Sequence, residues 1–167
     1  PPVQAEMDRI PADLRKTYAG VFAPDFNTPF PWSHGPRRMG TDKNADVLWV
    51  GNSWSGSLAR IDTHSKALSF VPLPENLQPY HVAVDSKHNA WTNLWMTDRV
   101  ARYSPSSGQW TVFDLPTRGS EARYVSVDEH DGVTRVVLPS FRTRKVAVMT
   151  LRSEADINAL KEQAQKP

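Results

Sequence analysis

The sequence contains no cysteine, and this absence removes several kinds of chemistry. Disulfide bridges, thiolate nucleophiles and cysteine-held zinc or iron–sulfur sites are all excluded. The lack of cysteine suits a periplasmic or secreted protein, which is the location that we favour. Long hydrophobic runs are missing too, because no stretch approaches the roughly eighteen apolar residues of a membrane span. We therefore expect no membrane span.

Neither sign of charge dominates, because 20 Lys and Arg residues face 18 Asp and Glu residues and leave a net charge of +2. The densest basic cluster lacks an aromatic ladder, and it consists of Arg135, Arg142, Arg144 and Lys145. A solvated loop explains this cluster better than a nucleic-acid site. The five histidines show no H-x-H or H-E-x-x-H spacing, so no metal site is predicted from spacing and no cofactor is evident.

What the sequence does contain points to β structure. Hydrophobic residues make up 39% and charged residues 23% of the 167 residues, which is a globular composition large enough for one domain with a core. Fourteen prolines and six tryptophans indicate many turns and large aromatic anchors. These features favour strands over a helical bundle.

The middle of the chain repeats itself. Three stretches align at intervals of 43 residues: GPRRMGTD from Gly35, QPYHVAVD from Gln78 and EARYVSVD from Glu121. Further matches appear at 42 residues, where Trp49 aligns with Trp91 and SFVPLP with TVFDLP. Several anchors recur in the same order, so the match is not a coincidence. A period of about 42 is typical of four-stranded propeller blades or of paired-helix repeats.

Periodicity separates these two possibilities. Each unit contains four short β runs with turn signals between them and no helical stripe. The sequence therefore predicts an all-β fold, a β-propeller of four-stranded blades at about 33–75, 76–118 and 119–152. Because propellers close with about four to eight blades, the chain should be an open segment. Its missing blades would come from a longer parent chain, a partner subunit or another copy of this chain.

The two flanks do not match the repeat. Residues 1–32 are expected to be an N-terminal extension, rich in Phe and Pro near its end, that docks on the blades. A chain that begins Pro1-Pro2 is either processed or a piece of something longer. Residues 153–167 should form a C-terminal helix or tail, because Ser153 and Asp156 resemble a capping box before a helix from Glu154 to about Ala164.

The second repeat, PYHVAVDSKHNAW followed by RVARYSPSSGQWTVFDLP, resembles the blades of the virginiamycin B lyase (streptogramin lyase) type of β-propeller. The resemblance extends over the three blades. It implies a seven-bladed propeller in the intact protein. In that lyase, a magnesium ion and a histidine with nearby glutamates open a cyclic ester by elimination. At the positions where the lyase family has its glutamate, this sequence has Asn52 and Leu94. At the positions of the family's histidine, it has Arg37, Tyr80 and Arg123.

Two sets of residues are candidates for ligand binding. The first is a repeated Asn-x-Trp, at Asn52 and Trp54 and again at Asn93 and Trp95, in loops that can open at one end of the central channel. An amide beside an indole suits a polar organic ligand, although a turn-capping Asn and a Trp packed between blades are the alternative.

The second set lies where the innermost strand of each unit begins. Arg37, Tyr80 and Arg123 would line the channel and favour a carboxylate or a phosphate, unless they serve as contacts between blades. Near the same end, His81 and His34 are candidates for a catalytic base or ligand. The recurring Asp42, Asp85 and Asp128 stand at strand–turn junctions, where they should accept hydrogen bonds from turn N–H groups.

These observations predict a binding or interaction module within a lyase-like propeller, with a polar or anionic ligand at the channel mouth, and favour binding over catalysis. The alternative is a magnesium-dependent streptogramin-type carbon–oxygen lyase. That alternative requires at least two carboxylates around a magnesium ion at the channel mouth.

Overall fold

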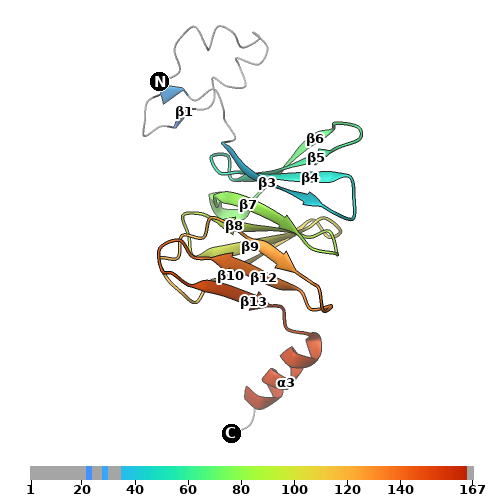
Figure 1. The fold of residues 1–167 in the computed structure, drawn as a ribbon, viewed down its shortest axis with the longest axis vertical. Coiled ribbons are helices and arrows are strands. Elements are labelled where there is room, and N and C mark those ends of the chain that lie inside the picture. Colours follow the sequence, from blue (N-terminus) through green and yellow to red (C-terminus); the bar gives the residue numbers. More distant parts are fainter. Residues whose placement is uncertain (1–21, 24–27, 30–34, 165–167) are drawn as a thin grey trace.

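The computed structural model describes residues 22–23, 28–29 and 35–164. Almost all of the predicted N-terminal extension and also His34 lie outside these residues. A short antiparallel pair, β1 (Phe22–Ala23) and β2 (Thr28–Pro29), is described within the extension. From Gly35 onward the chain forms three antiparallel sheets, one after another, followed by a helix (Figure 1).

Each sheet is a meander in which consecutive strands pair, and we call the sheets blades 1, 2 and 3. Blade 1 contains β3 (Pro36–Asp42), β4 (Val47–Asn52), β5 (Ser57–Asp62) and β6 (Leu68–Pro72), followed by a 3₁₀ turn, η1 (Pro74–Asn76). Blade 2 contains β7 (Pro79–Val84), β8 (Ala90–Leu94), β9 (Arg99–Ser104) and β10 (Gln109–Asp114). Blade 3 contains β11 (Ser126–Asp128), β12 (Arg135–Pro139) and β13 (Val146–Thr150).

Blade 3 departs from the predicted four strands, because the described residues supply only three. After β13 the chain does not turn back but enters α3 (Glu154–Ala164). The predicted capping box stops the strand there: the Asp156 N–H donates to Ser153 Oγ at 3.1 Å, and the Ser153 N–H donates to Asp156 Oδ2 at 2.9 Å. The C-terminal helix is therefore confirmed. Among the described residues this blade has three strands, where the repeat predicts four. The predicted blade boundaries stay a prediction.

The blades stack through their first strands, since β7 contacts both β3 and β11. One buried cluster lies between blades 1 and 2 around Trp49 and Leu58, and a second lies between blades 2 and 3 around Trp91 and Val136. The repeat-equivalent Trp49 and Trp91 are 1% and 0% exposed. Each sheet thus buries its apolar face against the next one, as repeated units that cannot fold alone must do.

The recurring aspartates lie at strand–turn junctions, as predicted. Asp85 accepts hydrogen bonds from the Lys87 N–H at 3.0 Å and from the indole N–H of Trp91 at 2.9 Å. Asp42 accepts a hydrogen bond from the Asn44 N–H at 3.0 Å and lies 2.7 Å from His88 Nδ1 in blade 2. These carboxylates therefore shape turns and connect blades.

Apolar side chains remain exposed on the two outer blades. Met39 and Leu68 in blade 1 are 58% and 57% exposed, and Val146 and Val148 in blade 3 are 62% and 60% exposed. The chain is a partial propeller whose end faces have no neighbouring blade among the described residues. Within the same residues, no helix has the length and apolar character needed to cross a membrane.

Candidate functional site

The strand register brings the two predicted sets of ligand-binding residues together. The start of each inner segment faces the end of the second strand of its blade, as in the pairs Pro36–Asn52 and Pro79–Leu94 and the bridge Ala122–Ser140. The hairpin turns after β4, β8 and β12 consequently lie beside the residues that open the inner segments. One end of the three blades therefore gathers arginines and aromatic rings.

These side chains form an arc in which guanidinium groups alternate with rings. Arg37 Cζ lies 5.1 Å from the ring centroid of Trp54 and 5.3 Å from that of Trp95. Arg123 Cζ lies 5.9 Å from the Trp95 centroid and 4.6 Å from that of Phe141. Each distance is within the range of a cation–π contact. We call Trp54, Arg37, Trp95, Arg123 and Phe141 the aromatic–arginine arc.

Tyr80 supports the middle of the arc. Its ring lies 5.3 Å from the Trp95 ring, between centroids, and 5.7 Å and 5.9 Å from the guanidinium carbons of Arg38 and Arg37. Its position at the start of β7 matches that of Arg37 in blade 1. The predicted trio of Arg37, Tyr80 and Arg123 therefore spans all three blades at one end of the stack, and its place at a channel stays a prediction.

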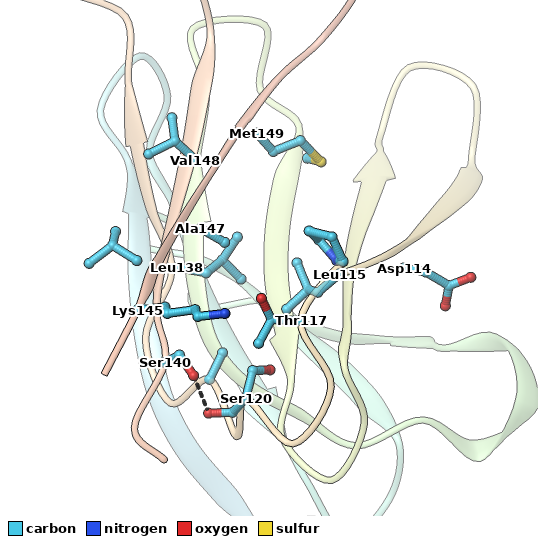
Figure 2. Close-up of a pocket in the computed structure, with 13 residues that line it drawn as sticks. Asp114, Leu115, Thr117, Ser120, Leu138, Ser140, Lys145, Ala147, Val148 and Met149 are labelled. Atoms are coloured by element: carbon cyan, nitrogen blue, oxygen red, sulfur yellow. Dashed lines mark hydrogen bonds between the residues drawn. The ribbon is translucent and has the colours of Figure 1, made fainter. Parts of the chain in front are cut away.

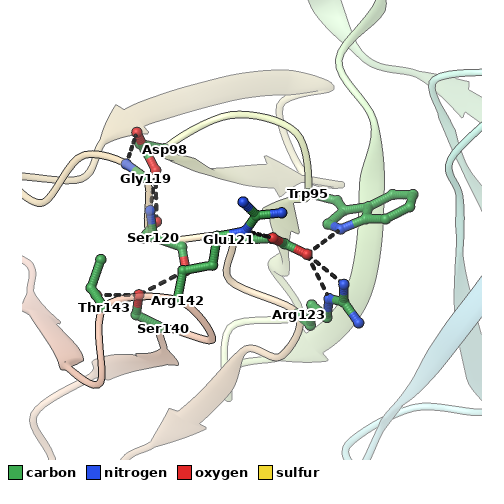
Figure 3. Close-up of polar contacts among 9 residues, drawn as sticks. All are labelled: Trp95, Asp98, Gly119, Ser120, Glu121, Arg123, Ser140, Arg142 and Thr143. Atoms are coloured by element: carbon green, nitrogen blue, oxygen red, sulfur yellow. Dashed lines mark hydrogen bonds and ion pairs between the residues drawn. The ribbon is translucent and has the colours of Figure 1, made fainter.

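A carboxylate is held at the blade 3 end of the arc (Figure 3). Glu121 Oε1 accepts hydrogen bonds from Arg123 Nη2 at 2.5 Å, Arg123 Nε at 3.0 Å and Trp95 Nε1 at 3.5 Å, and Arg142 Nε bonds the other oxygen. The hydrogen bonds from Arg123 and then Arg142 lower the pKa of Glu121 to about 2. Glu121 is therefore ionised at any pH near neutrality.

A groove of about 490 Å³ lies along this end of the arc, between the turn after β8 and the start of blade 3. Asp98 fixes its wall by accepting hydrogen bonds from the backbone N–H groups of Gly119 and Ser120, each at 2.8 Å (Figure 3). The side chains of Arg123 and Arg142 are 42% and 70% exposed, so their remaining N–H groups can reach a ligand. The volume lies within the range of small-molecule sites, about 300–1,000 Å³.

The two predicted asparagines lie beneath the arc. Asn93 is fully buried, accepts the His81 N–H at 3.0 Å and donates to Ala122 O at 2.5 Å. Asn52 is 2% exposed and donates to Ser57 Oγ at 3.4 Å. Both amides thus hold parts of the blades together. Direct ligand binding by Asn52 or Asn93 stays a prediction, and the burial of the two side chains does not support it.

The predicted catalytic histidine, His81, is packed between blades 2 and 3. Its ring stacks on Tyr124 with centroids 4.1 Å apart, and its Nδ1 lies 3.0 Å from Val125 O. Burial lowers the pKa of His81, and the positive charge of Arg38 acts in the same direction. The ring is therefore neutral at pH 7, and a role in catalysis stays a prediction.

Three members of the site were not predicted as ligand-binding residues: Phe141, Arg142 and Glu121. Phe141 occupies in blade 3 the place of Trp95 in blade 2, since each directly follows the residue that pairs with the start of the inner segment, Ser140 and Leu94 respectively. An alignment of Ser140-Phe141 with Leu94-Trp95 could have revealed it. No local signal points to Glu121, because two of its partners, Trp95 and Arg142, come from two distant hairpin turns.

A magnesium ion, which the lyase resemblance implies, does not fit these residues. Within residues 35–164, no group of three or more His, Asp or Glu side chains lies close enough to hold a metal. The carboxylate at the mouth, Glu121, is already engaged by two guanidinium groups.

No protein-family model matches the chain, and no curated protein matches it. Among solved structures, a streptogramin B lyase matches with a TM-score of 0.54 at 14% identity, over 72% of this chain and 42% of the lyase. The virginiamycin B lyase of Staphylococcus aureus matches with 0.56 at 13%, over 74% and 43%. Hydrazine synthase of Kuenenia stuttgartiensis matches with 0.53 at 12%, over 72% and 36%.

These similarities define the class of fold. The chain is a segment of a β-propeller and spans less than half the length of each of these proteins. More narrowly, its blades have the virginiamycin B lyase-like propeller fold. At these identities the likeness establishes the fold alone.

Proposed function

We propose that this chain is the ligand-binding part of a larger propeller and that its aromatic–arginine arc takes a planar aromatic molecule with a carboxylate or phosphate group. The observation that carries this proposal is the alternation of two guanidinium groups with three rings across three blades. Of the rings, Trp54 and Phe141 are 51% and 67% exposed.

The chemistry of the arc favours a negative charge beside a ring. Arginine forms paired hydrogen bonds with carboxylate and phosphate oxygens, and its flat guanidinium group stacks on aromatic faces. Glu121 gives an internal example, because its carboxylate is bound by Arg123, Arg142 and the Trp95 indole together. A ligand carboxylate at Arg37 would find an equivalent guanidinium that has Trp54 and Trp95 on either side.

The remaining blades are the proposed partners of this chain. The exposed Met39, Leu68, Val146 and Val148 supply apolar surface at both ends of the stack, which suits further sheets. We propose that these sheets come from the parent chain, a partner subunit or another copy.

Titration of the full chain with indole-3-acetate, followed by NMR, tests the ligand proposal. We expect a dissociation constant of roughly 10–1,000 µM, since few groups contact a small ligand in an open groove. The Arg37→Gln, Arg123→Gln double variant should weaken binding by about tenfold or more. The control is Arg60→Gln, because Arg60 lies on β5, outside the arc.

Tryptamine, which replaces the carboxylate by an ammonium group, should bind far more weakly than indole-3-acetate. Equal binding of the two compounds, or an unchanged affinity in the double variant, would overturn the proposal. Phosphate alone tests whether charge without a ring is sufficient, and its binding should be weaker than that of indole-3-acetate.

A further inference from the structure

In the part of the chain that the structure describes, the outer edge of blade 3 lacks the strand that covers the same edge in blades 1 and 2. The third strands β5 and β9 are paired on both sides, with β4 and β6 and with β8 and β10 respectively. Among the described residues, β13 pairs with β12 alone. A free edge with apolar side chains, here Val146 and Val148, presents unpaired backbone groups to any extended chain.

Blade 2 shows what a fourth strand does at the junction with the preceding blade. Trp110 on β10 packs against Tyr103, with ring centroids 5.1 Å apart. Its indole N–H donates to Pro72 O at the end of β6, at 3.0 Å. Trp110 therefore covers the outer end of the junction between blades 1 and 2. In blade 1, which has no preceding blade among the described residues, Leu68 at the equivalent position is 57% exposed.

The junction between blades 2 and 3 is open at the same place. A cavity of about 360 Å³ lies there, between β13 and the segment that follows β10 (Figure 2). Asp114 takes the place of Pro72, and Met149 takes the place of Tyr103 in the repeat. Both line the cavity, together with Leu115 and Ala147. This volume greatly exceeds the roughly 30 Å³ share of one water molecule and suits a large apolar side chain.

We propose that β13 accepts an extended strand, antiparallel to it, from a separate partner polypeptide, and that this strand inserts an aromatic ring into the cavity beside Met149. The strand completes blade 3 by backbone pairing, which is the β-augmentation mode of recognition. An indole in the cavity donates to Asp114 O, as Trp110 does to Pro72 O. The pattern of the strand follows that of β10, in which Trp110 faces Tyr103.

A peptide with the sequence of β10 and its flanks, GQWTVFDLP (residues 108–116), is the probe. Binding of the fluorescein-labelled peptide to the full chain is measured by anisotropy. We expect saturable binding, and at least tenfold weaker binding of the matched peptide in which the Trp is replaced by Ala, because the ring supplies the anchor. No binding at 1 mM, or equal binding of the two peptides, would refute the proposal.

Two further measurements locate the bound peptide. Hydrogen exchange should show new protection in β13 and none in β6; protection in β6 would refute the site. The variant Ala147→Phe fills the cavity from within, so it should abolish the advantage of the Trp peptide over the Ala peptide. A full chain that dimerises and protects β13 without peptide would show that a second copy is the occupant, which also overturns the proposal.

Discussion

Asn93 Nδ2 lies 2.5 Å from the carbonyl oxygen of Ala122, and this single hydrogen bond joins the second strand of blade 2 to the start of blade 3. The same amide accepts the His81 N–H through its oxygen at 3.0 Å. Asn52, which opens the other Asn-x-Trp segment, donates within its own blade, to Ser57 Oγ at 3.4 Å. The two asparagines thus have different roles, because the strand register places Asn52 opposite Pro36 but places Leu94, not Asn93, opposite Pro79.

We predict that Asn93→Ala lowers the free energy of unfolding by about 2–4 kcal/mol, because two buried backbone groups lose their partners. Urea denaturation of the full chain measures this loss. The matched control is Asn52→Ala, which removes one long hydrogen bond and should cost about 1 kcal/mol. Equal losses in the two variants would contradict the role of Asn93 as a clamp between blades.

We predict that acidification destabilises the protein through His81. Burial lowers the pKa of this histidine below its ordinary value of 6.5, so the unfolded chain binds the proton more readily than the folded chain. The contribution of His81 to stability is therefore complete above pH 6.5 and is lost as the pH falls through its folded pKa. Urea midpoints between pH 5 and pH 8 measure this effect.

The acid limb of the profile, which is the fall in the urea midpoint between pH 6.5 and pH 5, should be smaller in His81→Gln. His130 provides the control, because Asp128 raises the pKa of His130 and its contribution is lost as the pH rises, not as it falls. His130→Gln should therefore leave the acid limb in place. An unchanged acid limb in His81→Gln would show that other groups cause the destabilisation.

We predict that Gly40→Ala is more damaging than Gly108→Ala. A Cβ on Gly40 would lie 2.1 Å from Val82 O, so blades 1 and 2 would have to separate. Gly108 has a φ of +67° and open space around it, so an alanine there is strained by roughly 1 kcal/mol without any clash. Thermal denaturation measures both. A loss of stability that is no larger for Gly40→Ala would argue against this close approach of the blades.

We predict that Glu121→Gln increases the affinity for indole-3-acetate by about threefold to tenfold, or roughly 1 kcal/mol, because Arg123 and Arg142 lose their internal carboxylate. NMR titration measures the change. Asp98→Asn, which removes a negative charge from the groove wall without touching either arginine, serves as the control and should have a smaller effect. Weaker binding in Glu121→Gln would mean that Glu121 orients Arg123 for the ligand.

Much of the fold was predictable because its signals are local. Turn aspartates such as Asp85, tryptophans such as Trp91 and the Ser153–Asp156 capping box act on residues a few positions away. The aspartates and tryptophans recur with the repeat and therefore predict the blades. The capping box occurs once, after the last blade, and therefore predicts the C-terminal helix. The trio of Arg37, Tyr80 and Arg123 was found for the same reason, as equivalent positions of one repeat.

The sequence by itself determined three things about this protein: its β-rich repeat, its open set of blades and its terminal helix. Only the tertiary structure decided that Arg123 shares Glu121 with Arg142, that Asn93 is a clamp and that blade 3 has three strands among the described residues. The physical reason is distance along the chain. Turn and strand preferences depend on near neighbours, whereas stacking brings together side chains from separate blades whose pairing no local pattern encodes.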